Sequence, residues 1–252
     1  MGWPFFLQQG LNGISFALLL FLLASGLTLI FGLMRIANIA HGSFYLLGAY
    51  VGLSVMRWTH AFPLAILAGG ISVAAIGILM QRWFLARFHQ QTLAQVLLTM
   101  GFAFIFSDQA LLLWGGDPQS VPVPRVLAGT LVAGPIYFPI YRLFVIAVGA
   151  FVYAVLWLLL EKTRIGARVR AAVDDAEMAR GLGIDVWRVF TGVFALGAFL
   201  AAAAGVIGGA FLSVYLLDNF GKALFPELSY FTLFAPMALI LAIRPTGLFG
   251  RR

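Results

Sequence analysis

Long apolar runs separated by short polar segments cover almost the whole chain. A helix needs about 20 mostly apolar residues to cross a bilayer. Runs near this length lie at Leu11–Met34, Ile36–Met56, Phe62–Leu85, Leu93–Trp114, Tyr141–Leu160, Phe190–Leu217 and, shorter than the rest, Leu228–Ile243. The pattern predicts an all-α fold, a polytopic transmembrane helix bundle of about seven spans, with a single transmembrane domain over residues 1–252.

The charges between the runs predict how the bundle is oriented. Lys and Arg concentrate in cytoplasmic loops of membrane proteins. With the amino terminus outside, twelve of the 16 basic residues fall on the inner side and four on the outer side. We therefore expect the amino terminus outside and the carboxyl terminus inside. The Gly- and Pro-rich stretch Gly115–Pro139 then becomes an exposed outer connection with at most one shallow helical turn.

Composition agrees with a membrane protein and excludes several other classes. Apolar residues make up 62% of the chain and charged residues 10%, which is too apolar for a soluble domain. The chain has no cysteine, so it offers neither disulfides nor thiolate metal ligands. The net charge of +7 comes from residues scattered between the apolar runs, so we expect membrane lipid and not nucleic acid around it.

Polar side chains interrupt the apolar pattern between the first and second runs, within Arg35–Ser43. Such groups are costly at membrane depth unless they face protein or a water-filled path. We predict a broken helix near residues 32–42 that restarts near Ile36, which places Asn38 and His41 on one helical face. Broken helices of this kind meet substrates in many transporters.

Two interpretations of this region stay open. Asn38, His41 and Gly42 could line a substrate pathway, or the two side chains could only hydrogen-bond to neighbouring helices. A lone His without a second ligand or a carboxylate fits neither a metal site nor a nucleophile and its base. We therefore expect no catalytic residue and no metal.

The one sizeable hydrophilic segment is the inner loop of about residues 161–188. Within it, the acids Asp174, Asp175 and Glu177 are followed by Arg180 and then by Gly181 and Gly183. This order predicts a short helix, because acids stabilise the start of a helix, bases stabilise its end and a glycine often terminates it. Ala172, Ala176, Ala179 and Gly183 would give this helix a smooth face for docking in another protein's groove. The alternative is an ordinary positive-inside loop. Our candidate coupling residues are Asp174, Asp175, Ala176, Glu177, Ala179, Arg180 and Gly183.

The sixth run carries small residues at four-residue intervals, which lets helix backbones approach closely. These residues are Gly197, Ala201, Gly205 and Gly209. The second run contributes Gly48 and Gly52. We predict a helix-packing seam, within the bundle or towards a second subunit.

The chain contains no Walker motif, dinucleotide-binding glycine pattern or hydrolase signature. It therefore cannot hydrolyse ATP by itself, and we expect it not to be an enzyme.

Three stretches resemble the LivH-type permeases of the branched-chain amino acid ABC transporter family. Asn38–Gly42 with Tyr45–Tyr50 resembles their Asn-Phe-Ala-His-Gly signature. Thr163–Gly197 is similar to their cytoplasmic coupling segment and the following helix, and Arg244–Gly250 to their carboxyl terminus. One departure is that only Asp218–Leu228 precedes the last run, where the family usually has a Gly-rich segment and another helix.

The resemblance implies the permease subunit of an importer in a bacterial inner (plasma) membrane. Its partners would be ABC ATPase subunits, a second permease subunit (a related chain or a second copy) and an extracytoplasmic substrate-binding protein. The chain would bind no cofactor, while the partner ATPase uses ATP and magnesium. The cargo would be branched-chain or other hydrophobic amino acids, with urea, short amides or aromatic acids as alternatives. The competing class is an ATP-independent channel or secondary carrier for small polar solutes.

Overall fold

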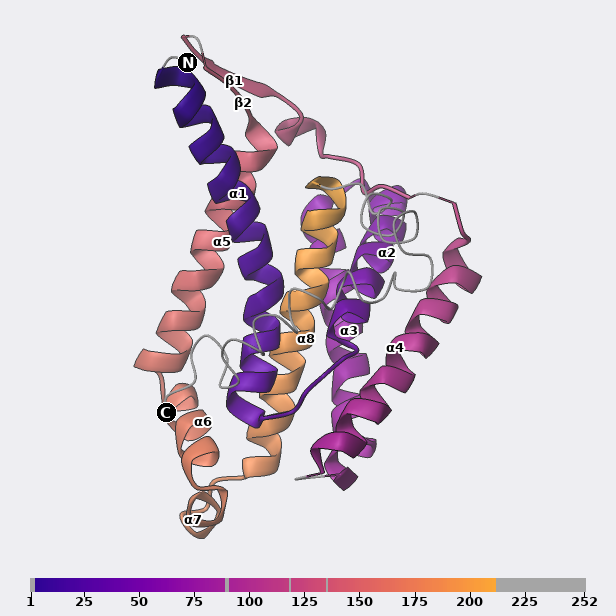
Figure 1. The fold of residues 1–252 in the computed structure, drawn as a ribbon, viewed down its shortest axis with the longest axis vertical. Helices are drawn as coiled ribbons and strands as arrows, with labels where there is room; N and C mark the ends of the chain where they lie inside the picture. Colours follow the sequence, from indigo (N-terminus) through magenta and orange to yellow (C-terminus); the bar gives the residue numbers. More distant parts are fainter. Residues whose placement is uncertain (1–2, 89–90, 118, 135, 212–252) are drawn as a thin grey trace.

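The computed structural model describes residues 3–88, 91–117, 119–134 and 136–211 of the 252 (Figure 1). The helices are α1 (Trp3–Thr28), α2 (His41–Thr59), α3 (Phe62–Trp83), α4 (Thr92–Trp114), α5 (Ile140–Trp157), α6 (Arg164–Asp174), α7 (Ala176–Gly181) and α8 (Val186–Phe211). Single π-helical turns extend α1 over Leu29–Leu33 and α5 over Leu158–Lys162. Short 3₁₀ turns lie at Leu85–Phe88 and Arg125–Leu127, and a hairpin joins β1 (Thr130–Ala133) to β2 (Ile136–Pro139).

Helix α8 is the central element of the described bundle. It contacts α1 on one side and α2 and α3 on the other, while α5 lies beyond α1 and α4 beyond α2 (Figure 1). The most apolar part of α8 is 61% buried, against 17% for both α4 and α5. The outer faces of α4 and α5 are therefore free to meet lipid or another subunit.

Five helical segments in the described part of the chain are long and apolar enough to cross a membrane. They are Phe5–Leu33, Phe62–Trp83, Thr92–Trp114, Ile140–Lys162 and Val186–Phe211. Together with the bundle architecture they identify a polytopic membrane protein. Helix α2 runs beside them and is not in this set, and the run Leu228–Ile243 lies outside the described residues. The count of about seven spans stays a prediction.

Glycines let α8 touch its neighbours at backbone distance. A Cβ atom at Gly205 would overlap the Tyr45 carbonyl of α2, and one at Gly48 would overlap the backbone of Ala202. Gly197 meets α1 in the same way, with the Gly26 carbonyl 2.7 Å from its Cβ position. The other two seam positions, Ala201 and Gly209, are buried on α8 as well. The seam joins helices of this chain.

The two ends of the bundle differ in character. One end carries the start of α1 and the β1–β2 hairpin, held together by the bond from Gln8 Nε2 to the Tyr137 carbonyl (3.0 Å). The opposite end carries α6 and α7 (Figure 1). The hairpin is absent from the sequence prediction, although β-branched and aromatic residues on both sides of a Gly-Pro dipeptide are a signal for strands separated by a turn.

Candidate functional site

The chain is not helical between α1 and α2. It leaves the π-helical turn, takes a left-handed conformation at Arg35 (φ 54°) and stays non-helical until α2 begins at His41. The predicted helix break is confirmed, but the restart near Ile36 is wrong. The carboxamide oxygen of Asn38 accepts a hydrogen bond from the Ala40 N–H (3.1 Å), and such local bonds compete with helix formation.

Asn38 and His41 meet across a turn and not on a helical face. The Asn38 carbonyl accepts from the His41 N–H (3.3 Å), so Asn38 precedes the helix that His41 starts. Both side chains are buried, at 0% and 3% exposure. His41 Nε2 donates to the Leu23 carbonyl of α1 (3.0 Å), because a carbonyl oxygen can only accept. The expectation of a shared helical face is corrected accordingly.

Each of these side chains keeps one buried polar atom without a partner among the described residues. The atoms are Nδ2 of Asn38, a donor, and Nδ1 of His41, an acceptor in the neutral ring that donates through Nε2. The N-cap residue of α2 is Ala40, which supplies no side-chain cap. Buried polar atoms are rarely left unpaired. These two atoms, close to Gly42 in the first turn of α2, therefore each have capacity for a further hydrogen bond.

Helix α4 holds the break in place through Thr99, which is fully buried. Its hydroxyl accepts from the Ile39 N–H (3.1 Å) and lies 3.3 Å from the Ala37 carbonyl. It therefore contacts one backbone donor and one backbone acceptor of the non-helical segment. One turn further along α4, the Ala103 carbonyl accepts from the Ser43 hydroxyl (3.4 Å). Thr99 is a functional candidate that the sequence prediction missed.

The inner segment forms two short helices with separate caps. The Thr163 hydroxyl accepts from the Gly166 N–H at the start of α6. The Asp175 carboxylate accepts from the N–H groups of Glu177 (3.0 Å) and Met178 (2.9 Å) and so starts α7. Gly183 follows with φ 81°, the left-handed conformation of a glycine stop. The predicted short helix is α7, with Asp175 as its cap, but Asp174 and Ala172 belong to the preceding helix α6.

The small-residue face of this segment is turned towards its own protein. Ala172 and Ala179 are buried in a cluster with Val186 at the start of α8, and Ala176 packs against that cluster. The interpretation of this face as a docking surface is corrected, since a partner cannot reach Ala172 or Ala179. The side chains exposed on α7 and just beyond it are Glu177, Met178, Arg180 and Leu182, and Asp174 and Asp175 are exposed before it.

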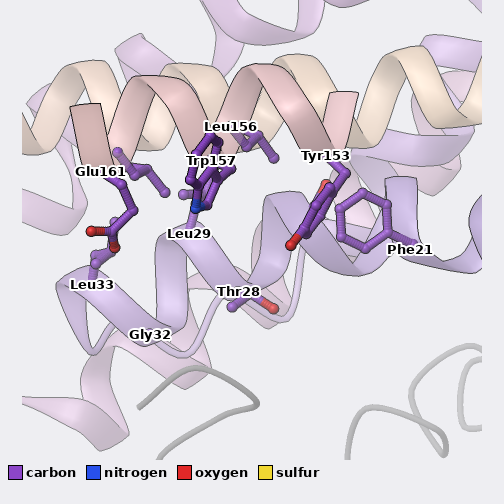
Figure 2. Close-up of a pocket in the computed structure, with 11 residues that line it drawn as sticks. Phe21, Thr28, Leu29, Gly32, Leu33, Tyr153, Leu156, Trp157 and Glu161 are labelled. Atoms are coloured by element: carbon purple, nitrogen blue, oxygen red, sulfur yellow. The ribbon is translucent and has the colours of Figure 1, made fainter. Parts of the chain in front are cut away.

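A cavity of about 210 Å³ opens between α1 and α5 and was not predicted (Figure 2). Both π-helical turns line it, and such turns often mark functional sites. Its walls include Phe21, Leu29, Leu156 and Trp157, with the Glu161 carboxylate at one end. One signal in the sequence could have indicated this cavity: the acidic Glu161 directly follows the apolar run Tyr141–Leu160. The sequence analysis assigned Glu161 to the inner loop instead.

The family described as branched-chain amino acid transport system / permease component matches residues 10–244. The chain belongs to this family. Its members are transport subunits and not enzymes, and the apolar helices of this permease component make it a multi-pass membrane protein.

The names of the relatives of this permease component refer to more than one class of transported solute. The high-affinity branched-chain amino acid permease protein BraD of Pseudomonas aeruginosa is 26% identical and covers 98% of this chain and 96% of BraD. LivH of Escherichia coli K12 is 28% identical over 83% of this chain and 72% of LivH. The xylose/arabinose import permease protein XylH of Sulfolobus acidocaldarius is 34% identical over 48% of this chain and 32% of XylH. No solved structure matches the chain significantly.

The comparison with BraD also bears on the length of this permease component. The aligned region spans 297 residues, more than the 252 of this chain, so BraD carries inserted residues. The expected shortening after Leu217 falls outside the described residues.

Proposed function

We propose that this permease component is the transmembrane subunit of an ABC importer for branched-chain or other hydrophobic amino acids. The observation that supports it best is the match to the family over residues 10–244, on a helix bundle with a capped, exposed inner segment. Energy would come from separate ATPase subunits that use ATP and magnesium, because the chain contains no nucleotide-binding motif.

The inner segment would receive the ATPase. Its exposed face combines the acids Asp174, Asp175 and Glu177 and the base Arg180 with the apolar Met178 and Leu182, exposed by 62% and 73%. Exposed apolar side chains that lie close together can contribute to a protein interface. Asp175 and Gly183 would set its shape, as cap and stop, and Ala176 and Ala179 would fix α7 to α8.

The break between α1 and α2 would lie on the solute pathway. Asn38 and His41 offer one unpaired donor and one unpaired acceptor there, beside Gly42. Thr99 would hold the segment in its non-helical conformation. A solute carboxylate or ammonium group could use these atoms in turn as it passes. The burial of both side chains fits a pathway that is closed in this conformation.

The remaining partners would be those of an importer in a bacterial inner membrane. A second permease subunit, related or identical, would cover one exposed face of the bundle, for which α4 and α5 are the candidates because their apolar segments are the least buried of the five. An extracytoplasmic binding protein would deliver the amino acid at the end that carries the β1–β2 hairpin.

The test is reconstitution of the chain with the subunits that co-purify with it. We expect an ATPase in the purified complex and ATP-dependent uptake of leucine, isoleucine or valine into vesicles. A complex without an ATPase, or one that takes up xylose and no amino acid, would overturn the proposal. Urea and an aromatic amino acid in the same assay examine the alternative cargoes.

A further inference from the structure

We propose that the cavity between α1 and α5 is a binding subsite for a zwitterionic aliphatic amino acid, with the ammonium group at Glu161 and the side chain among Leu29, Leu156 and Trp157. The inference rests on the proposed function and adds a second binding site on the solute pathway. It starts from the shape and chemistry of the cavity walls.

The cavity has one charged end and an apolar middle. In Figure 2 the Glu161 carboxylate lies at one end, Leu29 and Trp157 lie in the middle, and Tyr153 and Thr28 lie towards the other end. The volume of about 210 Å³ is below the roughly 300–1,000 Å³ of pockets for drug-sized ligands, which suits one small solute. An aliphatic side chain can fill the apolar middle, where it leaves water without losing hydrogen bonds.

Two charged side chains, Glu161 at the end of the cavity and Arg170 beside it, match both ends of a zwitterion. Glu161 Oε2 lies 4.0 Å from Arg170 Nη1, too far for a hydrogen bond, and both side chains are about half exposed. An exposed pair of this kind contributes little by itself. The carboxylate therefore remains available to an ammonium group, and the guanidinium, which also binds the Leu160 carbonyl, lies beside it for the solute carboxylate. A lipid chain would gain nothing from the carboxylate and would desolvate it.

The cavity wall is attached to the coupling segment. The Thr163 hydroxyl donates to the Leu159 carbonyl (2.6 Å) in the π-helical turn and also caps α6. Gly166 presses against the Leu160 carbonyl so closely that a Cβ atom has no room, and α6 touches the π-helical turn of α1 as well. Helix α6 is therefore in contact with both walls of the cavity, and we expect a displacement of α6 to be passed on to them. Because α6 lies at the end predicted to face the cytoplasm, the subsite would lie on the inner, releasing side of the pathway.

A cysteine reporter tests the proposal, because the chain contains no native cysteine. Thr28→Cys is introduced into the full complex in vesicles, and its alkylation rate is measured with and without L-leucine. We expect leucine to slow alkylation at least about threefold. Gly32→Cys is a second reporter, since a Cβ there has ordinary contacts only, 3.7 Å from Thr28. Val155→Cys, on the exposed side of α5 and outside the cavity lining, is the matched control and should react at an unchanged rate.

Analogues and one charge variant separate the possible occupants. We expect 3-methylbutylamine, which keeps the ammonium group, to protect the cysteine better than 4-methylpentanoate, which lacks it. Glu161→Gln should abolish protection by leucine at the same concentration. Alkylation that responds to the acyl-chain length of the vesicle lipid and not to leucine would overturn the subsite in favour of lipid.

Failure of the subsite and failure of the proposed function give different results. Normal ATP-driven leucine uptake with a cysteine that leucine does not protect, in both reporters, would overturn the subsite alone. An unmodified complex that takes up no amino acid would overturn the proposed function, and the subsite with it.

Discussion

At the scale of single residues, the buried polar atoms of the break decide what the site can do. His41 is bonded to α1 through Nε2, and Asn38 to the start of α2 through its oxygen, so each has its structural bond already. The atoms left over, Nδ1 and Nδ2, have no structural duty among the described residues. On the proposed pathway, these two atoms are the ones that a solute would bind, while the bonded atoms hold the fold.

His41→Ala and, separately, Asn38→Ala should therefore lower amino acid uptake far more than the amount of assembled complex. As a structural bond alone, the interhelical contact of His41 with Leu23 contributes only about 0.6 kcal/mol, and Asn38→Ala removes a local bond to the Ala40 N–H. The measurement is uptake per assembled complex in vesicles. His60→Ala, at the exposed end of α2, is the matched control and should transport normally. Unchanged uptake per complex in both variants would remove the break from the pathway.

Thr99→Val should impair transport, whereas Thr99→Ser should not. Valine keeps the shape of threonine but leaves the partly buried Ile39 N–H without its partner, at a cost of up to about 1–3 kcal/mol. The non-helical segment should then shift, which we expect to lower maximal uptake at least several-fold. Serine keeps the hydroxyl and should restore uptake. Equal uptake by the valine and serine variants would show that the hydroxyl has no positioning role.

The sequence could point to Asn38 and His41 but not to Thr99. Asn and His stand out in an apolar run because they are costly there. Threonine does not, since its hydroxyl can bond to a carbonyl of its own helix, and that of Thr99 lies 2.9 Å from the Gln95 carbonyl. Its contact with Ile39 joins residues 60 positions apart, which no local pattern reveals.

At the scale of elements, the apolar runs predicted the long helices well and the short elements poorly. The helix α4 (Thr92–Trp114) nearly coincides with the run Leu93–Trp114, because hydropathy and length alone decide a span. The break at Asp175 between α6 and α7 depends instead on one carboxylate bonding to two N–H groups. The alanine face of this segment is buried because it packs against the start of α8. The local sequence does not predict that contact.

Gly205→Ala should destabilise the bundle through the α2–α8 contact. The added methyl group would overlap the Tyr45 carbonyl, and overpacking of this kind costs about 1–3 kcal/mol. Gly192→Ala on the same helix is the matched control, because a Cβ there meets nothing within 4 Å. The apparent melting temperature of the detergent-solubilised protein should fall for the first variant only. Equal melting temperatures would mean that the seam can relax.

Leu182→Glu and Met178→Glu should release the ATPase without unfolding the permease component. Both side chains are exposed, so a charge disturbs a partner and not the core. Gly183→Glu is a poorer choice, because φ 81° strains any other residue there. Val126→Glu, at a position even more exposed and at the opposite end of the bundle, is the control. The fraction of ATPase that co-purifies should drop several-fold for the α7 variants, and normal co-purification would make this segment an ordinary loop.

At the scale of the whole molecule, the twelve-to-four distribution of basic residues predicts which end of the bundle faces the cytoplasm. The structure separates the two ends clearly, with the β1–β2 hairpin at one and α7 at the other (Figure 1). The same separation underlies the assignment of the binding protein to one end and the ATPase to the other.

Single cysteines at the two ends test this orientation directly, since the chain has none of its own. Leu131→Cys in the hairpin should react with a membrane-impermeant thiol reagent in intact cells, because its position is exposed at the predicted outer end. Met178→Cys in α7 should react only after the membrane is opened. Both positions are at least half exposed, so access across the membrane, and not burial in the protein, limits the reaction. The reverse pattern would invert the orientation and exclude α7 as the docking site of a cytoplasmic ATPase.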